Sequence, residues 1–241
     1  MIIYGINSVT EALRAGRVRS LTIADRGSDR VRALLDFASA RGVRIEHVDR
    51  AALDTLARGA AHQGVVAEVA PAPVATLDAL ADPAAGPPLI VVLDGIEDPH
   101  NLGAILRSVD AAGASGIVRQ TRRAAPLDGA AAKVSAGAVH HVAVADVVNV
   151  ARAIEELKAA GVWTVGLDAG ADTPYYDVDL TLPTALVLGA EGHGLRRLVR
   201  DRCDLVVTIP MAGHVESLNV SVAAAVVLFE AVRQRRSRGR R

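Results

Sequence analysis

The chain has 241 residues, of which 51% are hydrophobic and 22% charged, so it can form one large or two modest globular domains and is not intrinsically disordered. Aromatic side chains contribute only 2%, which leaves an aliphatic core, and the 27 basic residues balance the 27 acidic ones. The single cysteine, Cys203, excludes an internal disulfide and a cysteine-based zinc site.

No segment has the composition of a membrane anchor or a secretion signal. No apolar run approaches the ~20 residues needed to span a bilayer. The beginning of the chain, MIIYGINSVTEAL, lacks the basic and apolar regions of a signal peptide. We therefore expect a cytoplasmic protein with no membrane partner.

Residues 1–70 alternate short helical and extended patterns. Helices are predicted over 9–16, 28–42 and 50–59, and strands over 20–25, 43–49 and 64–70. This alternation indicates a small α/β domain. Residues 71–88 follow with five of the ten prolines in the chain, which predicts a semi-rigid linker.

Residues 89–232 show a different pattern, in which apolar runs alternate with helices. Strands are predicted over 89–94, 116–120, 139–147, 162–168, 184–189 and 205–210, and helices over 101–113, 150–161, 194–202 and 218–234. Such alternation is typical of a mostly parallel sheet covered on both faces. In these sheets ligands bind beyond the carboxyl ends of the strands, so the loops that follow strands are the places to look for a site.

The last nine residues, 233–241, carry six arginines and no acid. A basic tail of this kind is either a solvated, disordered end or an arm that binds phosphate. The sequence leaves both interpretations open.

The first loop that breaks the apolar pattern is LDGIEDPHNLGAILRS. Asp98 and Pro99 form a good helix cap and first turn. Gly103 lies one turn before Arg107, so the arginine could reach over the bare glycine backbone toward the loop. The alternative is that Arg107 pairs with Asp110 at the surface.

The second loop, ALVLGAEGHGL, places Glu191 among Gly189, Gly192 and Gly194. Glycines allow a ligand to approach the main chain closely. The spacing matches neither the dinucleotide fingerprint nor a P-loop. By itself a glycine-rich turn is weak support for a site.

The third loop is IPMAGHVESLNVSVAAAVVLFE. Ser217 or Asn219 can cap the helix that follows, so the cap needs only one of these two polar side chains. Ser221, one turn beyond Ser217, is a further polar residue that the cap does not need. The helix is apolar nearly all round, so we expect it to be buried, within the domain or against another subunit. Polar groups at the start of a buried helix need partners, and a ligand is one candidate.

Other kinds of site find little support. The seven histidines are scattered, and the adjacent pair His140 and His141 would face opposite ways on the strand expected there. VSAGA at 134–138 lacks the nucleophile elbow of a hydrolase. We expect no metal site.

Together, NLGAILRSVDAAG, LVLGAEGHGL and IPMAGHVESLNVSVAAAVVLFE closely resemble the three ordered motifs of the SpoU (TrmH-type) RNA 2′-O-ribose methyltransferases of the SPOUT superfamily. One subgroup of this family, which methylates a guanosine of 23S ribosomal RNA, carries a small RNA-binding domain that resembles ribosomal protein L30. IYGINSVTEAL and HQGVVAEV are similar to the two ends of that domain. The resemblance implies an L30e-like α/β domain over 1–70 and an α/β trefoil-knot domain over 89–232. It also implies S-adenosyl-L-methionine as cofactor, an RNA partner, a homodimer and no metal.

The resemblance also implies roles for particular residues. The residues that match the family's catalytic positions are Asn101, Arg107, Glu191, Ser217 and Asn219. The residues that match its cofactor-binding positions are Leu188, Gly189, Gly192, Ile209, Met211 and Leu218. In this scheme Arg107 stabilises the developing alkoxide of the ribose, because a guanidinium stays protonated and cannot act as a base.

Three alternatives remain. Within the family the substrate could be a transfer RNA or an adenosine of ribosomal RNA. Outside the enzymes, a non-catalytic RNA-binding protein could keep the fold, although a binder does not need all five catalytic positions together. A nicotinamide-dependent oxidoreductase is disfavoured by the glycine spacing.

Overall fold

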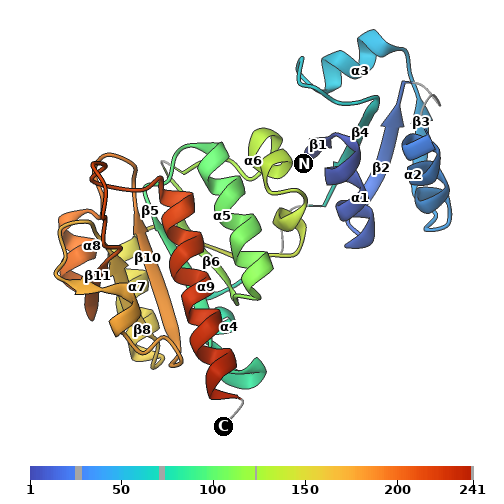
Figure 1. Ribbon diagram of the computed structural model, residues 1–241. Helices are drawn as coiled ribbons and strands as arrows, with labels where there is room; N and C mark the ends of the chain where they lie inside the picture. Colours follow the sequence, from blue (N-terminus) through green and yellow to red (C-terminus); the bar gives the residue numbers. More distant parts are fainter. Residues whose placement is uncertain (25–28, 71–73, 123, 240–241) are drawn as a thin grey trace.

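The structure is a computed structural model that describes residues 1–24, 29–70, 74–122 and 124–239 (Figure 1). Residues 71–73 of the expected linker 71–88 and residues 240 and 241 of the expected tail lie outside these ranges, as do residues 25 and 28 at the ends of two expected elements. The described residues form a four-stranded sheet near the N-terminus and a seven-stranded sheet after it. None of the described helices is long and apolar enough to cross a membrane.

The N-terminal part is a mixed sheet with helices beside it. Its strands, in the spatial order β1-β4-β2-β3, are β1 (Ile2–Tyr4), β2 (Val18–Ile23), β3 (Arg44–His47) and β4 (Val65–Val69). Its helices are α1 (Ile6–Arg14), α2 (Asp29–Ser39) and α3 (Arg50–Leu56). Only β2 and β3 run parallel. The sequence predicted every one of these elements except β1, which at three residues is too short to show a pattern.

The larger sheet is parallel at every strand pair among the described residues. Its strands are β5 (Leu89–Asp94), β6 (Gly116–Gln120), β7 (Val144–Val147), β8 (Trp163–Leu167), β9 (Thr173–Pro174), β10 (Thr184–Gly189) and β11 (Leu205–Thr208). Their spatial order is β7-β6-β5-β10-β8-β11-β9. The two central strands, β5 and β10, are buried at every position, which explains why both could be predicted to the residue.

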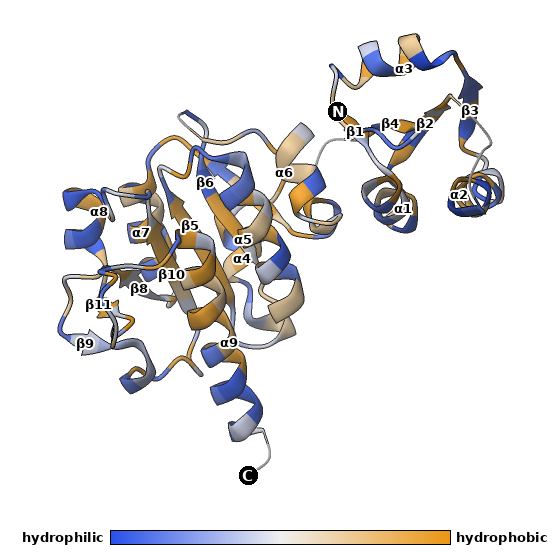
Figure 2. Ribbon diagram, turned by 45° about the horizontal axis from the view of Figure 1, so that its top comes forward, coloured by the Kyte–Doolittle hydropathy of each residue, from blue (hydrophilic) through white to orange (hydrophobic). Residues whose placement is uncertain are grey.

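Helices cover both faces of this sheet, as expected for a parallel sheet. On one face lie α5 (Pro99–Ala112), α6 (Gly129–Val134) and α9 (Val220–Arg238), and on the other α4 (Leu77–Ala81), α7 (Val150–Ala159) and α8 (Arg197–Arg202). Along β5, Leu89, Val91 and Leu93 pack into the first layer, and Ile90 and Val92 into the second. Figure 2 shows the resulting concentration of hydrophobic residues in the strands.

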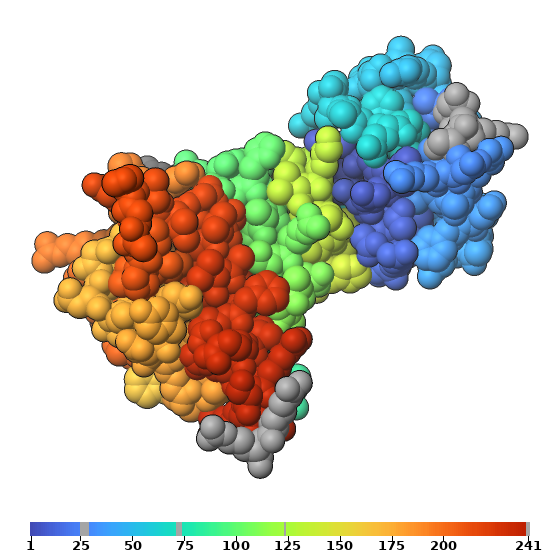
Figure 3. All heavy atoms as spheres, viewed as in Figure 1, coloured from blue at the N-terminus to red at the C-terminus, as the bar shows by residue number. Residues whose placement is uncertain are grey.

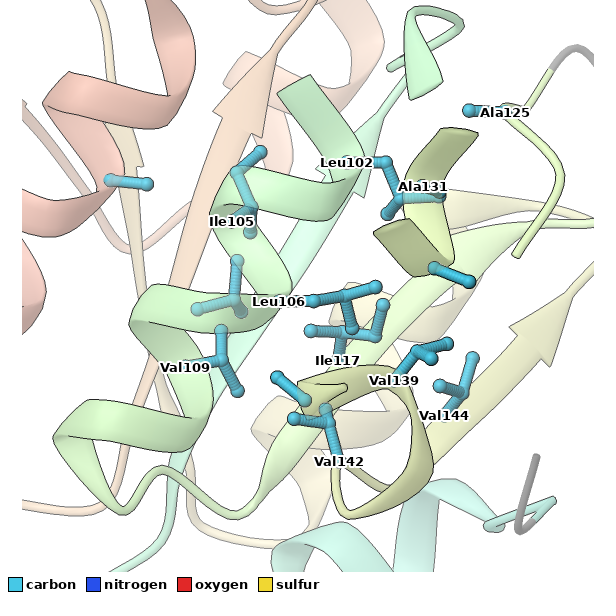
Figure 4. Packing of buried hydrophobic residues seen from close by; sticks show 14 of the residues in the cluster. Leu102, Ile105, Leu106, Val109, Ile117, Ala125, Ala131, Val139, Val142 and Val144 are labelled. Atoms are coloured by element: carbon cyan, nitrogen blue, oxygen red, sulfur yellow. The ribbon is translucent and has the colours of Figure 1, made fainter. Parts of the chain in front are cut away.

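Helix α5 packs closely against α6 and the turn after it (Figure 4). A Cβ atom on Gly103 would lie 2.7 Å from Ala131 O and 2.7 Å from Val134 Cβ. The bare backbone of Gly103 therefore admits α6 and does not open a route for Arg107, so the sequence interpretation of this glycine was wrong. The short, alanine-rich α6 itself was not predicted.

Only the last four residues of the strand expected over 139–147 are extended. Its first residues form a 3-10 helix, η2 (Ala138–His140), and only β7 is extended. The reason is a tertiary contact: Gly137, at φ 96°, turns the chain tightly against Glu11 of α1. His140 is 2% exposed and neither ring nitrogen has a partner among the described residues. Burial, with Arg17 and His141 nearby, lowers the pKa of His140 to about 4, so its ring is neutral at physiological pH.

The two parts of the chain contact each other through this region. One continuous cluster of buried apolar side chains contains Val9 and Leu13 of α1 together with Val139 of η2. Arg17 donates hydrogen bonds to the carbonyl oxygens of His140 (3.1 Å) and Ala70 (2.8 Å). The N-terminal part is therefore docked on the larger one through apolar and polar contacts, and Figure 3 shows it projecting from the larger body.

After β11 the chain does not continue outward. It returns across the carboxyl ends of β8 and β10, because residues 216–220 share a pocket with Leu167 and Leu188, and then forms α9 against α5.

The C-terminal residues correct the interpretation of 233–241 as a solvated end. Helix α9 continues to Arg238, and the half-buried Arg235 donates hydrogen bonds to four carbonyl oxygens. These carbonyls, which lie at the amino ends of β5 and β10, belong to Pro87, Pro88, Leu180 and Leu182. Burial lowers the pKa of Arg235 from its usual value.

We expect Arg235→Ala to lower the free energy of unfolding by about 2 kcal/mol, because it leaves several half-buried carbonyl groups without a donor. In a thermal scan this corresponds to a fall in Tm of roughly 4–8 °C. The matched control is Arg236→Ala, which removes an exposed arginine of the same helix. Equal midpoints for the two variants would contradict the assigned contacts.

Candidate functional site at the carboxyl edge of the sheet

The three loops singled out in the sequence meet at the carboxyl edge of the seven-stranded sheet. Two of them, with the residues that follow β8, line a pocket of about 530 Å³. Its lining includes all six residues expected to hold a cofactor, namely Leu188, Gly189, Gly192, Ile209, Met211 and Leu218. The volume lies within the range typical of small-molecule sites.

The glycine loop closes one wall of the pocket by folding back on the end of β10. Ala190 forms an isolated bridge with Gly194, and Gly192 and Gly194 have φ values of 78° and 63°. A Cβ atom on Gly189 would overlap the main chain of Gly194 and the amide of Leu195. The glycines are therefore required for this turn, and they leave main-chain groups facing the pocket.

A buried carboxylate holds the far end of the same loop. Asp94, the last residue of β5, is 1% exposed and accepts hydrogen bonds from Arg196 N (2.9 Å) and Arg196 Nε (2.6 Å). Arg196 also donates to Gln120 at 2.9 Å. The sequence reasoning missed this anchor, although an acid that ends a strand of five apolar residues was a visible signal.

A chain of side-chain hydrogen bonds joins the three loops. Asn219 Nδ2 donates to Asn101 Oδ1 (2.9 Å), and Asn101 Nδ2 donates to Glu191 Oε2 (3.1 Å). Asn219 also caps α9, because its Oδ1 accepts from Ser221 N at 2.9 Å. Asn101 is only 7% exposed, so these bonds satisfy an amide that has lost contact with water. One residue from each loop thus forms a single connected group.

The structure places the other two expected catalytic residues differently. Ser217 lines the pocket and is exposed. Arg107 is exposed on α5 and lies outside the pocket lining. Among the described residues it forms no ion pair with Asp110, so the surface-pair alternative is wrong as well.

The pocket also contains residues that sequence reasoning did not select. Asp168, His193 and Glu216 line it, the first from the loop after β8. Asp168 Oδ1 accepts a hydrogen bond from Gly170 N (2.9 Å), and Oδ2 lies 3.6 Å from Arg200 Nε. The loop after β8 has no glycine motif and no polar run, so only its place after a buried strand could have indicated it.

The site offers no thiolate and no metal cluster. Burial, followed by the charge of Asp204, raises the pKa of Cys203 to about 12, which leaves its thiol protonated. Among the described residues no three His, Cys, Asp or Glu side chains gather as a metal site would require. The side chains that line the pocket include the carboxylates of Asp168, Glu191 and Glu216, the amide of Asn219, the hydroxyl of Ser217 and the imidazole of His193.

Two family models match the chain. The SpoU rRNA Methylase family matches residues 88–229, and the RNA 2′-O ribose methyltransferase substrate binding family matches residues 2–75.

Individual proteins are similar over nearly the whole chain. The 23S rRNA (guanosine-2′-O-)-methyltransferase RlmB of Pseudomonas syringae pv. tomato is 47% identical over 239 residues, which cover 97% of this chain and 95% of that protein. The putative TrmH family tRNA/rRNA methyltransferase YacO of Bacillus subtilis is 43% identical, with 97% and 95% covered. Among solved structures, the SpoU methyltransferase AviRb from Streptomyces viridochromogenes in complex with AdoMet superposes with a TM-score of 0.82 at 31% identity, covering 98% of this chain and 91% of that one.

Gly189→Ala should abolish binding of S-adenosylmethionine, because the new Cβ atom would displace the wall formed by residues 190–194. Calorimetry with this ligand measures the effect. Gly213→Ala is the control, since a Cβ atom there has no neighbour within 4 Å and the glycine has no positive φ. Binding of the ligand by Gly189→Ala with unchanged affinity would show that the glycine wall does not shape the site.

Proposed function

The chain belongs to the SpoU rRNA Methylase family, and we propose that it transfers the methyl group of S-adenosylmethionine to the 2′-oxygen of a guanosine in 23S ribosomal RNA. The observation that carries the proposal is the convergence of Asn101, Glu191 and Asn219 at a pocket with glycine-rich and apolar walls. Because ribosomal RNA is the substrate, we place the protein in the cytoplasm.

The pocket fits the cofactor in size and in chemistry. Ile209 and Leu218 offer apolar side chains on which an adenine ring could lie, and Leu188 and Gly189 offer main-chain groups at the end of β10. Asp168 and Glu216 add negative charge beside the pocket, which suits a ligand that carries a sulfonium and an ammonium group. When bound, the cofactor supplies an activated methyl group and needs no metal.

The residues of the chain then have to orient the reactants and stabilise charge. Asn219 and Ser217 line the pocket from the start of α9, where they can direct the ribose oxygen. Glu191 receives the hydrogen bond of Asn101 and so has a defined orientation in the glycine loop. We assign Asn101 to positioning, because its side-chain oxygen accepts from Asn219 and its side-chain nitrogen donates to Glu191.

Arg107 is proposed to hold an RNA phosphate and to stabilise the 2′-oxygen as it loses its proton. Its exposed guanidinium, with no ion pair among the described residues, is available for such a ligand. It lies six residues beyond Asn101, or roughly 9 Å along α5. That distance and its exposure on α5 are the reason that it does not reach the pocket of its own chain.

We propose a homodimer, in which Arg107 of one chain could act at the pocket of the other. Helix α9 packs on α5 and leaves Val222 and Phe229, which are seven residues apart and each 48% exposed, on one outer stripe of the helix. The sequence predicted a helix buried all round, and within one chain this helix is not. A second copy seated on the stripe would cover both side chains, and it would bring its Arg107 close to the first copy.

Residues 1–70 are proposed to bind the RNA substrate. The substrate-binding family model matches residues 2–75, and residues 1–70 hold ten arginines against eight acids. Arginine suits phosphate because its planar fork can bond two oxygens. Contact with the larger part through Arg17 fixes where bound RNA would lie relative to the pocket.

To test the activity, the full chain is incubated with S-adenosylmethionine and a 23S ribosomal RNA transcript, and 2′-O-methyl marks are mapped. We expect one methylated guanosine, and Arg107→Lys should lower kcat about 100-fold with unchanged affinity for the cofactor. Lysine keeps the charge but loses the fork. Arg152→Lys on α7, at the opposite face of the sheet, is the matched control.

The result also separates the alternatives. RNA binding without methyl transfer by the wild-type chain would favour a non-catalytic protein. Transfer to transfer RNA or to an adenosine would place the chain elsewhere in the family. Near wild-type turnover by Arg107→Lys would show that Arg107 has no role in methyl transfer.

The double change Val222→Glu and Phe229→Glu should convert the dimer to a monomer in sedimentation and abolish methyl transfer, because it buries two charges in an apolar interface. Leu198→Glu is the control, since Leu198 is an apolar residue of α8 with 55% exposure on the other face. A wild-type chain that sediments as an active monomer would contradict the dimer.

A further inference from the structure

Ser221 does not line the pocket but contacts Asn219, which does. It is in the first turn of α9, where main-chain N–H groups have no acceptor within the helix. Its N–H donates to Asn219 Oδ1 at 2.9 Å, and its hydroxyl donates to the same oxygen at 2.6 Å. Ser221 therefore makes two contacts to one oxygen atom of a residue that lines the pocket.

These two contacts fix the orientation of the Asn219 amide. A main-chain N–H can only donate a hydrogen bond, so the group that faces it must be the oxygen of Asn219 and not the nitrogen. The nitrogen then points the other way, toward Asn101 Oδ1 at 2.9 Å. A flipped amide would set donor against donor at the main-chain N–H of Ser221 and lose that contact, and the hydroxyl could keep its contact only by accepting instead of donating.

The same reasoning applies to Asn101, the partner of Asn219. Asn101 is 7% exposed, so an unsatisfied amide there would carry the full cost of desolvation. Because its oxygen accepts from Asn219, its nitrogen is turned toward Glu191 Oε2 at 3.1 Å. Every bond in the series thus points from α9 toward the carboxylate, and the direction is fixed at one end by Ser221 and at the other by Glu191, whose carboxylate can only accept.

We propose that Ser221 is a positioning residue for methyl transfer, which orients Glu191 in the glycine loop through Asn219 and Asn101. The proposal rests on the proposed function for its effect on turnover and on the hydrogen-bond geometry alone for its effect on the amides. Ser221 is not among the described residues that line the pocket, so it acts through its neighbours and not by touching a ligand.

The asparagine composition makes the geometry directly measurable. The chain contains four asparagines, Asn7, Asn101, Asn149 and Asn219. After asparagine-selective ¹⁵N labelling, the spectrum should therefore show four side-chain amide groups. The Nδ2 protons of the buried Asn101 should exchange with solvent more slowly than those of the exposed Asn7 and Asn149, which serve as internal references, and those of Asn219, which is exposed but donates to Asn101, should be intermediate.

In Ser221→Ala, we expect faster exchange at both Asn219 and Asn101 and a fall in kcat of about fivefold to tenfold, the value of one lost hydrogen bond. Affinity for S-adenosylmethionine should stay within about twofold, because the pocket lining is intact, and Ser221→Thr should restore both the exchange rates and kcat. Ser237→Ala is the matched control, since Ser237 is a serine of the same helix whose hydroxyl bonds only Arg233 O among the described residues.

A purely structural role would lower Tm without changing the Asn101 signals or kcat, and that result would overturn the proposal. So would unchanged exchange at Asn101 in Ser221→Ala, or a failure of threonine to restore it. If Ser221→Ala does not fold, Ser221→Thr and Ser221→Val give the same comparison, because they differ only in the hydroxyl. If the wild-type chain methylates no RNA, the proposed function fails, while the exchange measurements still decide the role of Ser221.

Discussion

The return of the chain after β11 is the constraint on which the rest of the structure depends. By crossing the carboxyl ends of β8 and β10, the segment from Ile209 to Asn219 forms one wall of the pocket and delivers α9 to the side of α5. Nothing local to this segment explains its path, because its exposed residues have few partners of their own. Its path is fixed by its ends: β11 pairs with β8 at one end, and Asn219 bonds Asn101 at the other.

Helix α9 is held at both edges of the sheet. At the carboxyl edge its first residues bond Asn101 through Asn219, and at the amino edge Arg235 bonds the segments that lead into β5 and β10. Between these ends Ala224, Leu228 and Ala231 are fully buried. Because a helix is stiff, contacts at its two ends also fix its rotation about its axis. The stripe of Val222 and Phe229 on its outer side therefore has a defined position, which a surface for another subunit requires.

The sequence determined some features of this fold more clearly than others. The bounds of β5 and β10 were predicted to the residue, because strands buried on both faces are mostly apolar runs between turn residues, and those of β6 were predicted although it ends in two half-buried polar residues. The pocket lining was indicated by resemblance to a family. Features that depend on distant packing were missed or misassigned: α6 on the bare face of Gly103, the turn at Gly137 against Glu11, and the bonds of Arg235. In each case the deciding neighbour lies far away in the sequence, so no local pattern records it.

The position of α9 also has a consequence for how the protein is made. Helix α9 follows every other element of the seven-stranded sheet in the chain, yet it packs on α5, and its first residue Val220, with Leu218 and Asn219 just before it, lines the pocket. Chains emerge from the ribosome with the N-terminal part first, so β5 to β11 are synthesised before α9, when α5 and α6 cover only part of the face that α9 completes. A partly synthesised chain therefore has no complete pocket. The site is therefore assembled only when α9 has taken its place against α5.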